Sequence, residues 1–191
     1  VINSEYWHNI VYPWDLIDGN RLALQNLALF KSGKIERNVV LKGPISIGSG
    51  SVLCSGSYLE GPISIGDNCI IGPNSYIGNS VSIGDNTRIG AFSEIKDSIV
   101  MSDSIIGSYN SLVGTVVGNG TEFGTNVVAN PSNRKVTYLD HTISLSERGA
   151  MVGNRCVIGN RAVLAGGSIL LEGATIGEGE VYNADFQGDT I

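Results

Sequence analysis

Hydrophobic positions recur along this chain with a period of six residues. Every sixth residue from 35 to 101 is aliphatic or methionine, and the segment GPISIG at 43–48 recurs unchanged at 61–66. A fixed repeat indicates one structural unit stacked on copies of itself. A helix with 3.6 residues per turn cannot keep this repeat on one face, whereas three short strands can close a coil. The pattern predicts a parallel β-helix in which these residues point inward: Ile35, Leu41, Ile47, Leu53, Leu59, Ile65, Ile71, Ile77, Ile83, Ile89, Ile95 and Met101.

A second set of positions, two residues before each aliphatic one, is also predicted to point inward. It is often filled by small residues such as Ser57 and Cys69, and it ends with Ile99. Alternation between inward and outward positions is typical of a strand. Glycine commonly follows the aliphatic residue, and pairs such as Asp67-Asn68 then add turn-forming residues. The sequence therefore predicts an all-β triangular prism with one strand and one corner per hexad.

Residues 1–34 do not follow the repeat, and we interpret them as a leader that contains one helix. Pro13 stands where a helix can begin, because proline suits the first helical turn. Five apolar residues after it are compatible with one amphipathic helix: Leu16, Ile17, Leu24, Leu27 and Leu29.

The hexapeptide region is predicted to run from 35 to 191, with one interruption. The repeat slips in phase after residue 102, disappears over 131–148 and resumes at Val152. The runs VTYL and TISL flank Asp140-His141 and are predicted to pair as a hairpin. Rigid scaffolds often carry function on such loops, so the inserted loop is the first place to expect a site.

Composition narrows the function. Glycine supplies 26 of 191 residues and charged residues only 16%, which is typical of a solenoid with a narrow core. The formal net charge of −6 argues against nucleic acid as a partner, and no apolar run is long enough to span a membrane. Cys54, Cys69 and Cys156 lack metal-ligand spacing, so we expect no metal and reduced thiols in a cytoplasmic protein.

The leader and the repeat together resemble a known family. The stretch YWHNIVYPWDLIDGN is similar to the segment that ends the nucleotidyltransferase domain of sugar-1-phosphate nucleotidylyltransferases and leads into their C-terminal β-helix. Eight residues carry this match: Trp7, Asn9, Ile10, Pro13, Trp14, Asp15, Leu16 and Asn20. The resemblance is strongest to the archaeal bifunctional enzymes that also acetylate an amino-sugar phosphate.

The resemblance implies a left-handed coil and the C-terminal half of a cytoplasmic enzyme of nucleotide-sugar biosynthesis. It implies sugar phosphate as a ligand, acetyl-CoA as the acyl donor, and magnesium only in the missing nucleotidyltransferase half. It also implies a homotrimer. Apolar residues expected to point outward on stacked faces fit such an assembly: Val40, Val52, Tyr58, Ile70, Tyr76 and Val100.

The acyl-transfer site of the family is matched only in part. Acetylating members carry a histidine in the prism that deprotonates the sugar amine, and Ser108 stands in its place, followed by Tyr109 and Asn110. Asn130 matches an amide-bearing position of the family, and His141 in the inserted loop is the candidate replacement base. Five basic residues near the loop are predicted to contact the acceptor or the phosphates of acetyl-CoA: Arg134, Lys135, Arg148, Arg155 and Arg161.

Three functions follow from these observations. The preferred one is the C-terminal β-helical domain of a sugar-1-phosphate nucleotidylyltransferase, which mediates trimerisation and carries a degenerate acyl-transfer site. The first alternative is an active acetyl-CoA-dependent amino-sugar-1-phosphate N-acetyltransferase domain. The second is a non-catalytic binding module of the same architecture.

Overall fold

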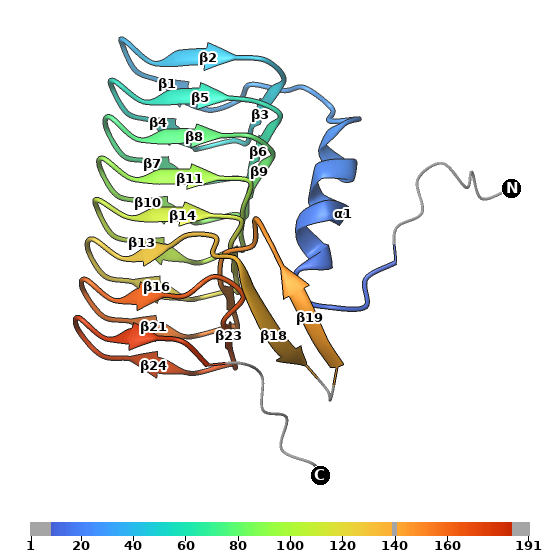
Figure 1. Cartoon of the computed structure of the whole chain (residues 1–191). Helices are drawn as coiled ribbons and strands as arrows, with labels where there is room; N and C mark the ends of the chain where they lie inside the picture. Colours follow the sequence, from blue (N-terminus) through green and yellow to red (C-terminus); the bar gives the residue numbers. More distant parts are fainter. Residues whose placement is uncertain (1–8, 139–140, 185–191) are drawn as a thin grey trace, which may run out of the picture.

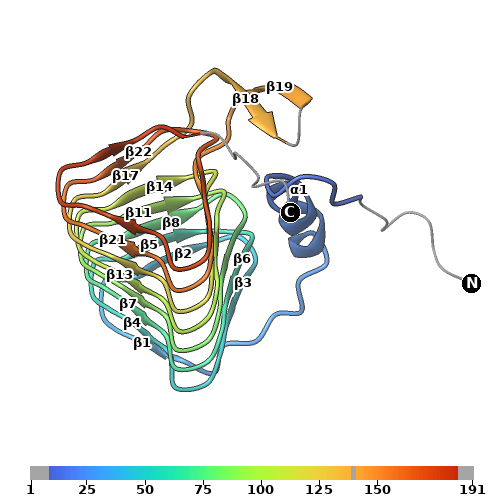
Figure 2. The same ribbon diagram turned by 90° about the horizontal axis from the view of Figure 1, so that it is seen from below.

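The chain forms one left-handed parallel β-helix with a single helix, α1 (Asp15–Leu24), beside it (Figure 1). The computed structural model describes residues 9–138 and 141–184. Figure 2 views the coil from its C-terminal end, and the chain runs clockwise as it approaches the viewer, which makes the coil left-handed. The predicted all-β prism with a short N-terminal helix and one inserted loop is confirmed.

Three parallel sheets of eight, eight and seven strands form the faces of the prism. We name each face after its first strand. The β1 face contains β1 (Lys34–Ile35), β4 (Val52–Leu53), β7 (Ile70–Ile71), β10 (Arg88–Ile89), β13 (Ile105–Ile106), β16 (Glu122–Phe123), β21 (Val157–Ile158) and β24 (Thr175–Ile176). The β2 face contains β2 (Val40–Lys42), β5 (Tyr58–Glu60), β8 (Tyr76–Gly78), β11 (Glu94–Lys96), β14 (Ser111–Val113), β17 (Val128–Ala129), β22 (Val163–Leu164) and β25 (Val181–Tyr182). The β3 face contains β3 (Ile45–Ile47), β6 (Ile63–Ile65), β9 (Val81–Ile83), β12 (Ile99–Val100), β15 (Val116–Val117), β20 (Met151–Val152) and β23 (Ile169–Leu170).

The core is a set of aliphatic ladders inside the prism. From Ile47 to Ile95 every predicted inward residue is at most 3% exposed. Ile35 is 40% exposed although it aligns with the buried Leu53, because it belongs to the first strand of its sheet and no coil covers it. Up to Ile95, the six-residue pattern thus predicts the core correctly wherever a coil lies on both sides.

The predicted phase is wrong at the last position of the regular run. Val100 is 1% exposed and pairs with Ile83 inside the prism, whereas Met101 is only partly buried and packs outside it. Ser98 is buried in the small position and Ile99 packs outside the prism. The step from Ile95 to the next core residue is therefore five residues, and Val100 is not an outward residue.

A second five-residue step follows in the next coil, between Leu112 and Val117, which are both fully buried. Both shortened steps occur at the corner between the β2 and β3 faces, which we call the β2–β3 corner. Gly114 makes this corner in the second of them with φ of 62°, a conformation that suits glycine. The inserted segment leaves the prism at the same corner one coil later.

The inserted segment forms an antiparallel hairpin of β18 (Arg134–Tyr138) and β19 (His141–Leu145). Both the hairpin and α1 pack on the outer side of the β3 face (Figures 1 and 2). Their buried apolar cluster consists of Trp14, Ile17, Val116, Val136, Leu145, Met151 and Ile169. Burial of these apolar side chains holds the leader helix against the prism.

Helix α1 begins after Pro13 as expected. The carboxylate of Asp15 accepts hydrogen bonds from the backbone nitrogens of Val11 and Tyr12 at 2.9 Å each. The helix ends at Leu24, earlier than the apolar pattern suggests, because residues 30–32 pair instead with the backbone of Ile47 at the edge of the β3 face.

Candidate functional site

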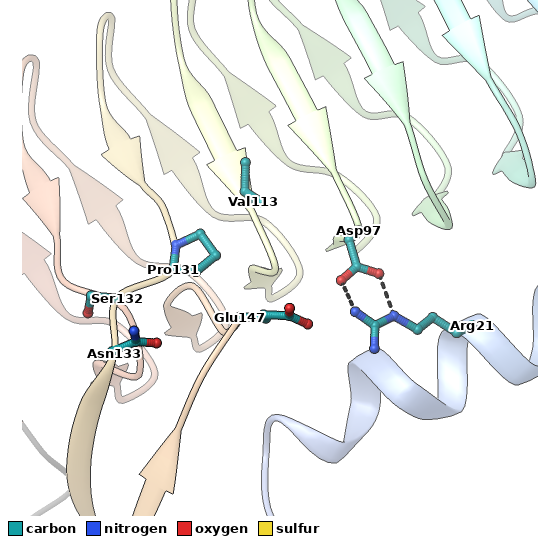
Figure 3. Close-up of a pocket in the computed structure, with 7 residues that line it drawn as sticks. All are labelled: Arg21, Asp97, Val113, Pro131, Ser132, Asn133 and Glu147. Atoms are coloured by element: carbon teal, nitrogen blue, oxygen red, sulfur yellow. Dashed lines mark hydrogen bonds and ion pairs between the residues drawn. The ribbon is translucent and has the colours of Figure 1, made fainter.

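A pocket of about 400 Å³ lies at the β2–β3 corner, where the hairpin leaves and rejoins the prism (Figure 3). It collects residues from the leader helix, two coils and both ends of the insertion: Arg21, Asp97, Val113, Pro131, Ser132, Asn133 and Glu147. Segments distant in the sequence meet here because α1 contacts the corner from which the insertion leaves the prism.

One wall of the pocket is an ion-pair network. Arg21 Nε donates to Asp97 Oδ1 at 2.7 Å, and a terminal nitrogen of the same guanidinium donates to Asp97 Oδ2. Arg21 also pairs with Asp18 at 2.8 Å, and Arg148 pairs with the second oxygen of Asp18 at 2.7 Å. Hydrogen bonding to Asp97 is the main reason why the pKa of Arg21 is raised. A bidentate pair of this kind holds the helix in one orientation.

The opposite wall carries the carboxylate of Glu147. Within the described residues Glu147 forms no salt bridge, and its side chain points toward the Arg21–Asp97 pair in Figure 3. Its backbone has a φ of 60°, which is uncommon for a residue other than glycine, asparagine or aspartate. Glu147 can accept a hydrogen bond or a proton from a ligand in the pocket, and Ser132 and Asn133 offer further polar groups.

A line of polar side chains on the β2 face leads toward the pocket. The hydroxyl of Ser111 lies 3.3 Å from Glu94 Oε2 and 3.1 Å from Asn130 Oδ1, so it donates to one of them at a time. Asn130 directly precedes Pro131 of the pocket lining. Of the sequence-predicted ligands, Asn130, Arg134 and Arg148 each directly neighbour a residue of the pocket lining in the chain.

The segment Ser108-Tyr109-Asn110 lies at the other edge of the β2 face, at the corner after β13. Ser108 is half-buried and Tyr109 is 56% exposed, with its ring stacked on Phe92 at 5.1 Å between centroids. Asn110 is 1% exposed, and its amide donates to the carbonyls of Gly107 and Gly124 at 3.0 and 2.9 Å. The side chain of Asn110 is thus occupied in holding two coils together.

The basic residues that cluster in the sequence do not cluster in space. Arg148 lies at the β2–β3 corner, Arg155 at the corner after β20, and Arg161 at the corner after β21. Each forms an ion pair of its own, with Asp18, Glu172 and Glu178 respectively. The separation follows from the fold, because six residues along the chain move a side chain to the next corner. These three arginines therefore lie at different corners of one chain, and their contact with a phosphate stays a prediction.

The remaining predicted residues lie on the hairpin. Lys135 is exposed and borders a second cavity with Asn133 and Ser144. His141 begins β19 and pairs through its backbone with Tyr138. The side chains of Arg134 and His141 lie outside the described part of the structure, so their proposed roles stay predictions.

Sequence reasoning missed Arg21, Asp97 and Glu147 as pocket residues. No sequence pattern marks Arg21 as a pocket residue, because its position depends on how α1 packs against the prism. Asp97 lies in the first five-residue step, and Glu147 lies where the insertion returns to the prism. A carboxylate at a break in the repeat could therefore have pointed to both residues from the sequence.

One known protein family matches part of the chain. The family described as bacterial transferase hexapeptide (six repeats) matches residues 62–97, within the regular coils. Together with the architecture, this shows a hexapeptide-repeat β-helix domain.

Two relatives of known annotation are similar to part of the chain. The bifunctional protein GlmU of Methanocaldococcus jannaschii is 38% identical over 47 residues, which cover 25% of this chain and 12% of that protein. A bifunctional sugar-1-phosphate nucleotidylyltransferase/acetyltransferase of Sulfurisphaera tokodaii is 40% identical over 55 residues, covering 28% of this chain and 14% of the relative. The domain thus has partial-length similarity to archaeal bifunctional enzymes, and the matched stretch spans about an eighth of them.

Solved structures of acyltransferases are also similar to this chain, at lower identity. The acetyltransferase domain of PglB from Neisseria gonorrhoeae, in complex with acetyl coenzyme A, is 14% identical with a TM-score of 0.42, covering 80% of this chain and 54% of that one. UDP-N-acetylglucosamine O-acyltransferase from Moraxella catarrhalis is 15% identical with a TM-score of 0.47, covering 71% and 64%. Likenesses of this size do not extend to function.

Two further properties concern only the described residues. None of their helices is long and apolar enough to cross a membrane. No group of three or more His, Cys, Asp or Glu side chains gathers there in a way that would hold a metal ion.

Proposed function

We propose that this chain is the C-terminal β-helical domain of a cytoplasmic sugar-1-phosphate nucleotidylyltransferase of nucleotide-sugar biosynthesis. In this proposal the prism serves as an assembly platform and its acyl-transfer site is degenerate. The observation that carries it is the docking of the leader helix. Trp14 and Ile17 are 5% and 1% exposed, and Arg21 is held bidentately by Asp97, so an upstream domain would be joined rigidly to the prism.

The degenerate acyl site follows from what replaces the family's prism histidine. Ser108 has no pKa near neutrality and cannot act as the base. The side-chain amide of the nearby Asn110 already forms hydrogen bonds with backbone groups of Gly107, Gly124 and Val127. The chain contains only two histidines, His8 and His141. His141 lies in the hairpin strand β19, and His8 precedes the described residues.

The resemblance also supports a homotrimer, with sugar phosphate bound chiefly by the nucleotidyltransferase half. The direct test of the platform function uses the complete gene product. It should release pyrophosphate from UTP or dTTP with a sugar 1-phosphate, and deletion of residues 35–191 should abolish its assembly. Absence of pyrophosphate release with every sugar 1-phosphate tested would reject this proposal.

A second candidate function, acetyl-CoA-dependent N-acetylation of an amino-sugar phosphate, is favoured by Glu147. The amine of the acceptor would attack the thioester carbon, the amine proton would pass to the Glu147 carboxylate, and coenzyme A would leave as the thiolate. Glu147 forms no salt bridge with the described residues and lines a polar pocket close in the chain to Asn130, which fits the role of proton acceptor.

This candidate is tested by thiol release from acetyl-CoA with glucosamine 1-phosphate and galactosamine 1-phosphate. Turnover that Glu147→Gln abolishes and His141→Ala leaves intact would support Glu147 as the proton acceptor. Turnover lost in His141→Ala but retained in Glu147→Gln would place the base on the hairpin instead. No turnover by the parent chain would reject this candidate.

A further inference from the structure

In the described part of the chain, one corner of the prism joins two uncovered faces. Helix α1 and the hairpin lie on the β3 face, whereas the corner between the β1 and β2 faces lies on the far side of the prism (Figure 2). We call it the β1–β2 corner. Asn20 of α1 donates to the carbonyl of Ser80 at 2.9 Å and accepts from the hydroxyl of Ser82 at 2.5 Å, so polar contacts also hold the helix on the β3 face. The other two corners therefore each border a covered face.

Exposed apolar side chains of the prism gather on the two uncovered faces and at the corner that they share. Ile105 on the β1 face is 45% exposed, and Val181 on the β2 face is 67% exposed. Among the described prism residues the exceptions are Ile35, at the open N-terminal end, and Leu171, at the corner after β23. The set consists of Val40, Ile70, Phe92, Ile105, Tyr109, Val157, Val163 and Val181. Apolar surface spread over two adjoining faces indicates a partner that covers both.

Aromatic residues follow the β1–β2 corner over four successive coils. Tyr58 and Tyr76 begin β5 and β8 at this corner, and their rings stack at 5.7 Å between centroids. Phe92 and Tyr109 occupy the corner in the next two coils, where they stack at 5.1 Å and are 51% and 56% exposed. Their φ values of 57° and 61° are outliers for bulky residues. In the other six coils the same position holds Asn38, Gly56, Asn74, Asn126, Arg161 and Gly179.

We infer that the β1–β2 corner faces the threefold axis of a homotrimer, so that the β1 face of each copy borders the β2 face of the next. The inference rests on the homotrimer of the proposed function and assigns its contact surface. Three parallel prisms around one axis each turn a corner inward, and the two faces at that corner border the neighbours. With either of the other corners inward, α1 and the hairpin would lie between the prisms.

Arg88 gains a partner in this arrangement. It forms no salt bridge with any described residue of its own chain. Rotation about the axis keeps every coil at its height, so Arg88 on the β1 face is level with Glu94 on the β2 face of the neighbouring copy, since both belong to one coil. Glu94 contacts Lys96 of its own chain at 3.5 Å and can accept a second cation. Unlike charges therefore face each other across the contact.

The other two ionic residues of the outward β1-face ladder also fit. Glu122 is level with Asn130 of the neighbour, whose amide nitrogen can donate to it while the amide oxygen accepts from Ser111 at 3.1 Å. Lys34 already pairs with Glu36 of its own chain at 3.6 Å.

The area available at this corner is sufficient for a specific contact. Eight stacked strands span roughly 34 Å, and a strip of roughly 10 Å on each side of the corner gives roughly 700 Å² per chain. A standard specific interface uses about 800 Å² per partner.

Cross-linking of matched cysteines tests which corner lies at the axis. Tyr109→Cys and Asp103→Cys each place a thiol at an exposed position, with φ of 61° and 60°, the first at the β1–β2 corner and the second at the corner after β12. In a Cys54→Ser background, a short bis-maleimide should join chains of the Tyr109→Cys variant. Copies of Asp103 would lie one face width from the axis, roughly 30 Å from each other, and should not cross-link more than the Cys54→Ser parent. Equal products from the two variants, or no product from Tyr109→Cys, overturn the inference.

The mass of the full chain separates this contact from the homotrimer on which it rests. Sedimentation at micromolar concentration should give three times the 20.1 kDa of one chain. Tyr109→Lys places three like charges around the axis and should reduce the mass to that of one chain with an unchanged β-sheet signal, whereas Asp103→Lys should keep the wild-type mass. A trimer that Tyr109→Lys leaves intact overturns the contact alone. A wild-type chain that sediments as a monomer overturns the contact and the homotrimer together, and neither result depends on pyrophosphate or thiol release.

Discussion

Replacement of Val100 by alanine should destabilise the prism far more than replacement of the neighbouring Met101. Val100 is 1% exposed between Ile83 and Val117, its partners in the adjacent strands. Removing two buried methyl groups costs about 1.6 kcal/mol at about 0.8 kcal/mol per group. An unfilled cavity of about 40 Å³ adds roughly 1 kcal/mol. The total of about 2.5 kcal/mol corresponds to about 5–10 °C in melting temperature for a chain of this size.

Met101 contacts the α1 cluster from outside the prism, so Met101→Ala should cost about 1 kcal/mol or less. Urea unfolding followed by circular dichroism at 218 nm measures both variants beside the parent chain. The comparison isolates the five-residue step, because an uninterrupted hexad would place Met101 in the core and Val100 outside. A larger loss for Met101→Ala than for Val100→Ala would refute the register described above.

Three further outcomes follow from the structure. Gly149→Ala should prevent folding, because its added carbon would lie 2.2 Å from the Val113 carbonyl oxygen, whereas Gly177→Ala should melt within about 2 °C of the parent. Arg21→Ala should free the leader helix, seen as faster cleavage of the leader by chymotrypsin with an unchanged β-sheet signal; an unchanged cleavage rate would count against the ion-pair network. Burial raises the pKa of the Cys69 thiol in the folded chain above its value in the unfolded chain, which is about 8.5. The folded state therefore keeps its full stability below about pH 8.5 and loses stability as the pH rises through the higher, folded-state pKa. The melting temperature should fall above that pH, and less so in Cys69→Ala; equal falls would contradict it.

The sequence predicts the regular part of the fold well because one rule governs it. From Leu53 to Ile95 each strand has at least one aliphatic residue that points inward, and its outward neighbours are polar or aromatic in many coils. At Ile99-Val100-Met101 three apolar residues stand together, so the hydrophobic pattern alone cannot decide which one enters the core. The backbone decides, because Asp97 closes the corner with one residue fewer.

The candidate site is less predictable because corners, not sequence distance, decide which side chains meet. Arg148, Arg155 and Arg161 are close in sequence but lie on three different corners. Arg21 and Asp97 are 76 positions apart and form a bidentate pair. Helix docking on the β3 face is a packing outcome of many weak apolar contacts, which a repeat pattern does not encode.

Thiol release from acetyl-CoA by the purified chain tests the central claim most directly. With glucosamine 1-phosphate or galactosamine 1-phosphate as acceptor, the platform account predicts no release above the rate without protein, because Ser108 cannot replace a catalytic base that typically contributes about 10²–10⁴-fold. Sustained, acceptor-dependent release that Glu147→Gln or His141→Ala abolishes would contradict the account and make the domain an acetyltransferase.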